Sequence, residues 1–76
     1  MTLEEEILDC LVNDCEDIEQ LSLMIDIPVA KDKLIDSLNT LIEKRLIVKL
    51  PSGYHSDKDT YEITEKGREM WKKIPD

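Results

Sequence analysis

The spacing of apolar residues along this chain changes sharply immediately after Arg45. Before Arg45, apolar residues recur every three or four positions, which is the period of an amphipathic helix. After it, they form a nearly continuous run over 46–50 and then alternate over 60–63, which is typical of β-strands. The change predicts an α+β domain in which the helices come first and a β-hairpin follows.

Three helices are predicted before this change, over residues 3–14, 17–25 and 30–44. Thr2 and Glu5 have the spacing of a capping box at the first helix, and Asp17 is a suitable N-cap for the second. Pro28 favours an extended backbone at the residue before it, which separates the second helix from the third. The apolar positions of the third helix form one buried stripe: Leu34, Ile35, Leu38, Leu41 and Ile42.

The hairpin is predicted to consist of strands at 46–50 and 60–63, joined by the turn-rich segment 51–59. Thr64 is placed to cap a final helix over 65–74. No repeat, low-complexity segment or linker interrupts the sequence, and a chain this short buries only about 60% of its unfolded surface on folding. We therefore expect residues 1–76 to form one small domain.

Acidic and basic residues are distributed unequally along the chain, whose formal net charge is -8. Residues 1–27 contain nine acidic side chains and no Lys or Arg, so this part carries -9. Residues 28–76 contain all ten basic side chains and nine acidic ones, so this part carries +1. Such a division allows one face to meet a polyanion while the other stays acidic.

The predicted helix 30–44 has two solvent-facing stripes when its residues are projected at about 100° each. One stripe is basic and polar, and consists of Lys33, Ser37, Thr40 and Lys44. The other is mainly acidic, and consists of Asp32, Asp36, Asn39 and Glu43. The first stripe can contact phosphate, whereas the second would repel it.

Three segments resemble those of winged helix-turn-helix regulators and occur in the same order. Residues 17–21, Asp-Ile-Glu-Gln-Leu, resemble the opening of the helix-turn-helix in many bacterial and archaeal regulators. Residues 38–47, Leu-Asn-Thr-Leu-Ile-Glu-Lys-Arg-Leu-Ile, look like the end of a recognition helix and the strand after it. Residues 61–69, Tyr-Glu-Ile-Thr-Glu-Lys-Gly-Arg-Glu, are similar to the strand-to-helix join after the wing in regulators of the MarR and PadR kind.

The resemblance implies a winged helix, with a three-helix core, a two-stranded β wing and a C-terminal helix. It also implies a transcription-regulator module whose partner is double-stranded DNA. The recognition helix would contact phosphates and base edges through Lys31, Lys33, Ser37, Thr40 and Lys44. The wing would contribute Tyr54, His55 and Lys58, although the adjacent Asp57 and Asp59 weaken its attraction to phosphate.

The sequence departs from the family pattern at two places beside the recognition helix. The family usually has Gly after this helix, whereas this chain has Arg45, which adopts a left-handed conformation less readily. We therefore expect the helix to end differently. The connection from Ile27 to Leu34 is also longer than the usual tight turn, so the helix is expected to start late or at a different angle.

The net negative charge supports an alternative function, a winged-helix protein-interaction module that does not bind DNA. For each predicted DNA contact, the alternative is an ordinary solvated helix or hairpin residue. Trp71, with Met70 and Ile74, is interpreted as closing over the first helix, because a domain this small needs its only Trp in the core. The alternative is that these residues form the edge of a homodimer.

The sequence offers little support for catalysis or metal binding. It contains no Ser or Cys in a recognisable nucleophile motif and no glycine-rich phosphate loop. His55 lies near Asp57 and Asp59, but loop residues of this kind usually form a turn. A zinc site would need four clustered ligands, and only His55, Cys10 and Cys15 are of the usual kind. We expect neither an enzyme nor a cofactor.

The two cysteines and the hydropathy pattern suggest a reducing compartment. If Cys10 and Cys15 share one helix and its end, they lie about 8 Å apart on different faces, beyond the limit of about 7 Å for a disulfide. We expect both to be free thiols. The chain has no run of about 20 apolar residues and begins with acidic residues rather than a basic signal region, so we expect a cytoplasmic protein without a membrane span.

Overall fold

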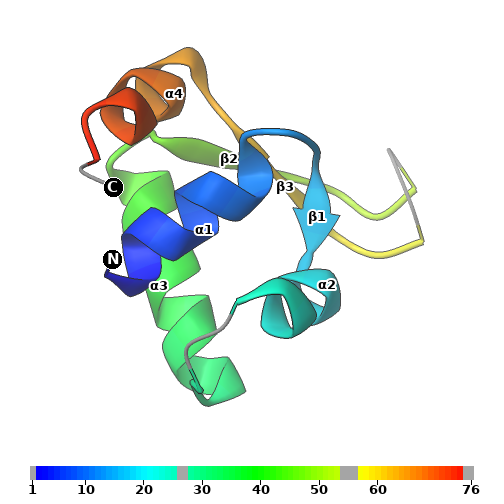
Figure 1. Cartoon of the computed structure of the whole chain (residues 1–76). Helices are drawn as coiled ribbons and strands as arrows, with labels where there is room; N and C mark the ends of the chain where they lie inside the picture. The colour runs from blue at the N-terminus through cyan, green and yellow to red at the C-terminus, as the bar shows by residue number, and fades with distance from the viewer. Residues whose placement is uncertain (1, 26–27, 54–56, 75–76) are drawn as a thin grey trace.

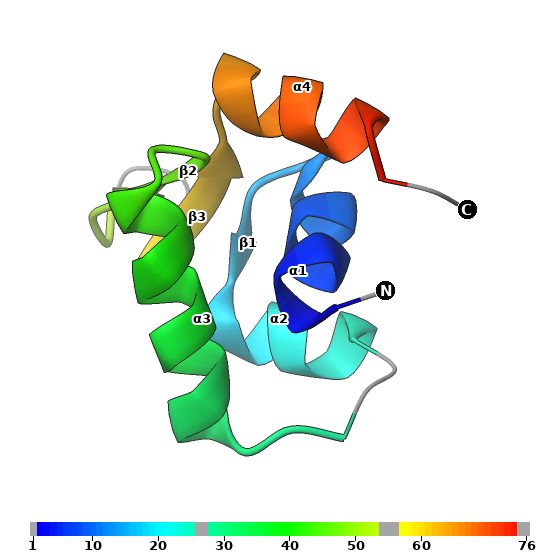
Figure 2. The ribbon, with the colours of Figure 1, turned by 90° about the vertical axis from the view of Figure 1, so that its left-hand side faces the viewer.

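The computed structural model describes residues 2–25, 28–53 and 57–74. In chain order, the elements are α1 (Leu3–Leu11), β1 (Glu16–Asp17), α2 (Ile18–Met24), α3 (Lys31–Glu43), β2 (Ile47–Leu50), β3 (Thr60–Ile63) and α4 (Glu65–Lys72). Helices α1, α2 and α3 pack together beside a small sheet, and α4 lies across the end of the molecule where α3 finishes (Figures 1 and 2). The α+β class is confirmed.

The sheet is antiparallel and has the order β1-β3-β2, so the last strand of the chain is central. The expected hairpin is confirmed: β2 pairs with β3 from Ile47 opposite Ile63 to Leu50 opposite Thr60. Strand β1 was not predicted. It consists of two charged residues, Glu16 and Asp17, which pair with Tyr61 and Thr60 and carry no apolar alternation that sequence reasoning could detect.

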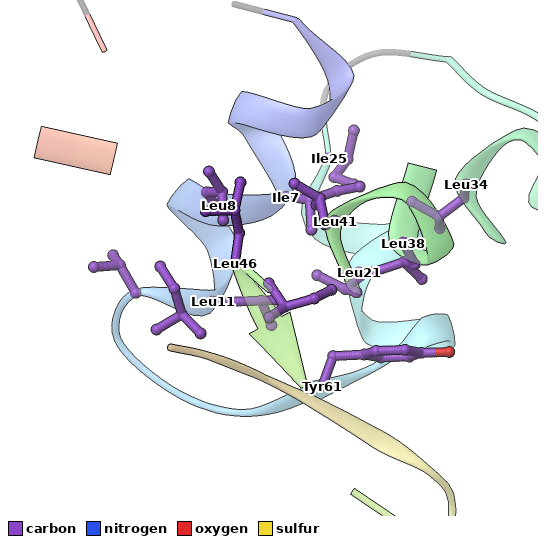
Figure 3. Close-up of a cluster of buried hydrophobic side chains, with 13 residues drawn as sticks. Ile7, Leu8, Leu11, Leu21, Ile25, Leu34, Leu38, Leu41, Leu46 and Tyr61 are labelled. Carbon is purple, nitrogen blue, oxygen red and sulfur yellow. The ribbon is translucent and has the colours of Figure 1, made fainter. Parts of the chain in front are cut away.

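The core lies between the three packed helices and the inner face of the sheet, as Figure 3 shows. Each helix of the core contributes residues at helical spacing, and Leu46, Ile47, Tyr61 and Ile63 close the cluster from the sheet side. The largest fully buried side chains are all aliphatic: Ile7, Leu11, Leu21, Leu34, Leu38, Leu41 and Ile47. Burial of these residues is the main stabilising contribution in so small a domain.

The three helix starts that the sequence suggested are formed by the expected side chains. Thr2 accepts a hydrogen bond from the Glu5 backbone N–H at 3.2 Å, and the Glu5 carboxylate accepts one from the Thr2 N–H at 2.8 Å, which completes the capping box. Asp17 accepts from the Gln20 N–H at 2.8 Å. Thr64 accepts from the Gly67 N–H at 3.0 Å. These caps satisfy backbone donors that the first helical turns leave without partners.

The expected end of the first helix was wrong. Helix α1 ends at Leu11 with Val12 as its C-cap, so Cys15 lies beyond the helix, just before β1. The argument that a shared helix separates the two thiols therefore does not apply to Cys15. Cys10 and Cys15 are both half-buried, and neither forms a disulfide bond among the described residues.

Helix α3 ends in the manner usual for a glycine-terminated helix, although Arg45 occupies the glycine position. Arg45 has a φ of 62°, in the left-handed region. The Leu46 N–H donates to the Leu41 carbonyl at 3.0 Å, and the Arg45 N–H donates to the Ile42 carbonyl at 2.9 Å. This is the Schellman pattern. The expectation that Arg45 makes the helix end differently was wrong, because the tertiary structure holds Arg45 in the conformation that glycine adopts more easily.

Helix α4 is held against the α3–β2 junction by a glycine. A Cβ atom at Gly67 would overlap the Leu46 carbonyl oxygen and would lie 2.7 Å from Cγ1 of Ile63. Trp71, one turn later, is half-buried against the core, and its Nε1 donates to the Asp9 carboxylate of α1 at 3.0 Å. The interpretation that Trp71 closes over the first helix agrees with this contact.

The described residues contain no helix that combines the length and the apolar character needed to cross a membrane.

The close approach of Gly67 to Leu46 predicts that a larger residue at position 67 will destabilise the protein. Gly67→Ala should lower the free energy of unfolding by about 2–3 kcal/mol, because the new methyl group meets backbone that cannot move aside without shifting α4. Urea unfolding measures the change. Lys66→Ala, on the exposed surface of the same helix, is the control and should stay within about 0.5 kcal/mol of the wild type. Equal stability of Gly67→Ala and the control would contradict the packing described.

The left-handed conformation of Arg45 predicts that glycine at this position will stabilise the protein. Arg45→Gly should raise the free energy of unfolding by about 0.5–1 kcal/mol. A residue with a Cβ atom costs about 1–2 kcal/mol in the left-handed region, and glycine avoids this cost. Part of the gain is lost because glycine has more conformational entropy in the unfolded chain. Thermal unfolding measures the difference. Lys44→Gly, at the preceding right-handed position, should destabilise the protein. A lower melting temperature for Arg45→Gly would show that the turn is not left-handed.

Candidate interaction surface on α2 and α3

Helix α3 presents its acidic stripe directly to solvent. Its buried side is marked by Leu34, Leu38 and Leu41. A projection at about 100° per residue places four residues on the opposite side, and all four are exposed: Asp32, Asp36, Asn39 and Glu43. The surface of α3 that points away from the core therefore carries three carboxylates and one amide.

The basic and polar stripe lies on one flank of α3, towards α1. Ser37 and Thr40 are half-buried, and the Thr40 hydroxyl donates to the Asp36 carbonyl of its own helix at 3.0 Å. The Lys44 ammonium forms an ion pair with Glu4 of α1 at 3.1 Å. Lys33 is exposed. The end of the predicted recognition stripe, at Lys44, is therefore paired with the acidic first turn of α1.

Lys31 and Lys58 lie on the other side of the acidic stripe, near the start of α2. Lys58, in the connection between β2 and β3, donates a hydrogen bond to Glu19 at 2.7 Å. This hydrogen bond and the charge of Lys58 lower the pKa of Glu19, and the charge of Lys31 adds to the effect. The hydrogen bond to Glu19 in turn raises the pKa of Lys58. The β2–β3 connection is thereby joined to the N-terminal turn of α2.

The predicted wing is described only in part, because Tyr54 and His55 lie outside the described residues. Near its base, Asp59 accepts a hydrogen bond from the Ser52 N–H at 2.8 Å and forms an ion pair with Lys49 at 3.3 Å. The two lysines of the described hairpin, Lys49 and Lys58, therefore both have carboxylate partners. Little positive charge remains on this surface for an incoming polyanion.

Three apolar side chains on α2 and α3 are exposed, which sequence reasoning missed. Leu23 is 81% exposed and Met24 is 44% exposed at the end of α2, and Ile35 of α3 is 39% exposed. The sequence analysis had assigned Ile35 to the buried stripe of the third helix. A signal was available for Leu23, because two positions after the buried Leu21 lies on the opposite side of a helix.

The described residues provide no obvious reactive group. Burial raises the pKa of the Cys15 thiol, and the negative charges of Glu62, Asp14 and Glu16 raise it further, so the thiol stays protonated at neutral pH. Within the part of the chain that the structure describes, no three His, Cys, Asp or Glu side chains are grouped as metal ligands would be.

No protein-family model matches the sequence, and the search of curated proteins found no significant match.

Proposed function

We propose that this chain is a winged-helix domain that works as a protein-interaction module. The order of its elements supports the winged-helix assignment, since three helices are followed by an antiparallel hairpin and a closing helix. In this assignment α2 and α3 are the helix-turn-helix, α3 corresponds to the recognition helix, and the β2–β3 hairpin is the wing. The resemblance of residues 17–21, 38–47 and 61–69 to winged-helix regulators is consistent with it.

The acidic outward face of α3 is the observation that carries the proposed function. A recognition helix enters the major groove between two rows of phosphates, where carboxylates are repelled. On α3, Asp32, Asp36 and Glu43 occupy the outward positions, whereas Lys44 is paired with Glu4 and the hydroxyl residues are half-buried. The same carboxylates would attract a partner with a basic surface and speed its association.

The exposed apolar residues of the helix-turn-helix favour a protein partner in particular. Leu23, Met24 and Ile35 gain nothing from contact with phosphates, but such side chains can be buried when two proteins associate. Ile35 lies one helical turn from Asp32 and from Asn39, so an apolar contact would be adjacent to the acidic stripe. The proposed partner therefore has apolar side chains surrounded by Lys and Arg.

DNA binding in transcription regulation is the second candidate. Its supporting observation is the exposure of Lys31 and Lys33 in the first turn of α3, neither of which has an ion pair among the described residues. Side chains at the start of a recognition helix are those that reach base edges and phosphates. On this hypothesis, the helix would approach DNA through its N-terminal turn.

Charge reversal on α3 tests the interaction module. The triple variant Asp32→Lys, Asp36→Lys, Glu43→Lys should weaken binding of an amphipathic lysine–leucine peptide by at least about tenfold, because the outward face becomes repulsive. Fluorescence anisotropy of the labelled peptide measures the affinity. The control, Glu6→Lys, Glu65→Lys, Glu69→Lys, changes the net charge equally on other surfaces. If both variants lose affinity to the same extent, the attraction is due to net charge and α3 is not the interface.

A mobility-shift assay on random duplex DNA distinguishes the two candidates. At about 50 mM salt and tens of micromolar protein, the wild type should give no shift, because nonspecific binding is electrostatic and the outward face is acidic. A shift that disappears in Lys31→Ala, Lys33→Ala but persists in Lys66→Ala, Lys72→Ala would instead support DNA binding through the start of α3. That result would overturn the proposed protein-interaction function in favour of DNA binding.

A further inference from the structure

A pocket of about 280 Å³ opens between the start of α1, the end of α3 and the last turn of α4. It lies on a different part of the surface from the outward face of α3. Its floor is apolar and is formed by Leu8, Leu41, Leu46, Met70 and Ile74. Met70 is 47% exposed, so the α4 side of the pocket offers apolar surface that is still in contact with solvent. Burial of an apolar group on this floor would be favourable.

The rim of the pocket carries charges of both signs. Glu4 and Glu5 line it from α1, Lys44 from the C-cap of α3, and Lys73 from the C-cap of α4. Lys44 and Glu4 form an ion pair at 3.1 Å, with the two side chains 55% and 38% exposed. Because exposed ion pairs are weak, a ligand with its own charged groups can compete for these side chains.

The helix ends around the pocket also have opposite partial charges. Helix α1 begins at the pocket with its positive end, whereas α3 and α4 finish there with their negative ends. A ligand with a single charge would be attracted by some of these groups and repelled by the others. The rim side chains carry full charges opposite in sign to the half charges of the helix ends beside them, so the side chains determine the attraction. The α1 side of the rim therefore favours a positive group, and the α3 and α4 sides favour a negative one.

We propose that this pocket binds a free apolar α-amino acid. The side chain occupies the floor, the α-ammonium group lies towards Glu4 and Glu5, and the α-carboxylate lies towards Lys44 and Lys73. A cavity of about 150 Å³ accommodates benzene, so a pocket about twice as large has room for the side chain of leucine or phenylalanine. This assignment is independent of the interaction module proposed above.

The first experiment compares ligands that differ only in charge, with saturation-transfer NMR on the wild-type protein. L-phenylalanine should bind at least about fivefold more tightly than N-acetylphenylalanine, which lacks the ammonium group, and than phenylalanine amide, which lacks the carboxylate. L-leucine tests the aliphatic alternative in the same way. Equal affinity of the blocked compounds would overturn the proposal in favour of simple apolar binding. Absence of binding of either amino acid up to about 10 mM would also overturn it.

Matched variants test whether the rim charges recognise the ligand. Glu5→Gln and Lys73→Gln should each weaken L-phenylalanine binding at least about threefold. Their neighbours Glu6→Gln and Lys72→Gln do not line the pocket and should bind as the wild type does. Glu5→Gln keeps a side chain that can complete the capping box, so α1 should remain folded, which circular dichroism checks. Equal effects at the lining and control positions would assign the binding to another surface.

Discussion

The backbone at Leu46 joins the two halves of this fold. Its N–H donates to the Leu41 carbonyl and ends α3, and its carbonyl accepts the Thr64 N–H at the start of α4. The same carbonyl lies against Gly67, and the Leu46 side chain is buried in the core. One residue therefore connects the end of α3, the start of the hairpin and the final helix. A displacement here would move β2, β3 and α4 relative to the helical core.

The position of α4 follows from this junction and determines where the pocket is. Gly67 allows α4 to approach the α3–β2 turn, and Trp71 then reaches Asp9 of α1. Met70 of α4 and Ile74, just after this helix, are left beside the start of α1 and the end of α3. Two lysines at helix C-caps and two glutamates in the first turn of α1 therefore surround one apolar floor. Each charged residue suits its own helix end, where its charge complements the helix dipole.

The candidate interaction surface depends on how α3 is rotated about its own axis relative to the core. Sequence periodicity separated the two solvent stripes of α3 correctly, but it did not show which stripe points away from the core. The orientation depends on how Leu34, Leu38 and Leu41 pack against the other helices, and this packing leaves Asp36 exposed and Ser37 half-buried. Similarly, Lys44 and Lys58 were counted as contacts for DNA, yet they pair with Glu4 and Glu19 from segments about 40 residues away in sequence.

The sequence by itself determined the elements whose signals are local. The caps at Thr2, Asp17 and Thr64 and the helix and strand periods depend on neighbours within about four residues, so the helix starts and the hairpin could be predicted. Only the tertiary structure decided the features that depend on distant partners. Strand β1 exists because β3 pairs with it, Arg45 is left-handed because the turn after α3 requires it, and Leu23 is exposed because no other element covers it. The physical reason is that such contacts depend on how complete elements pack, which no local pattern encodes.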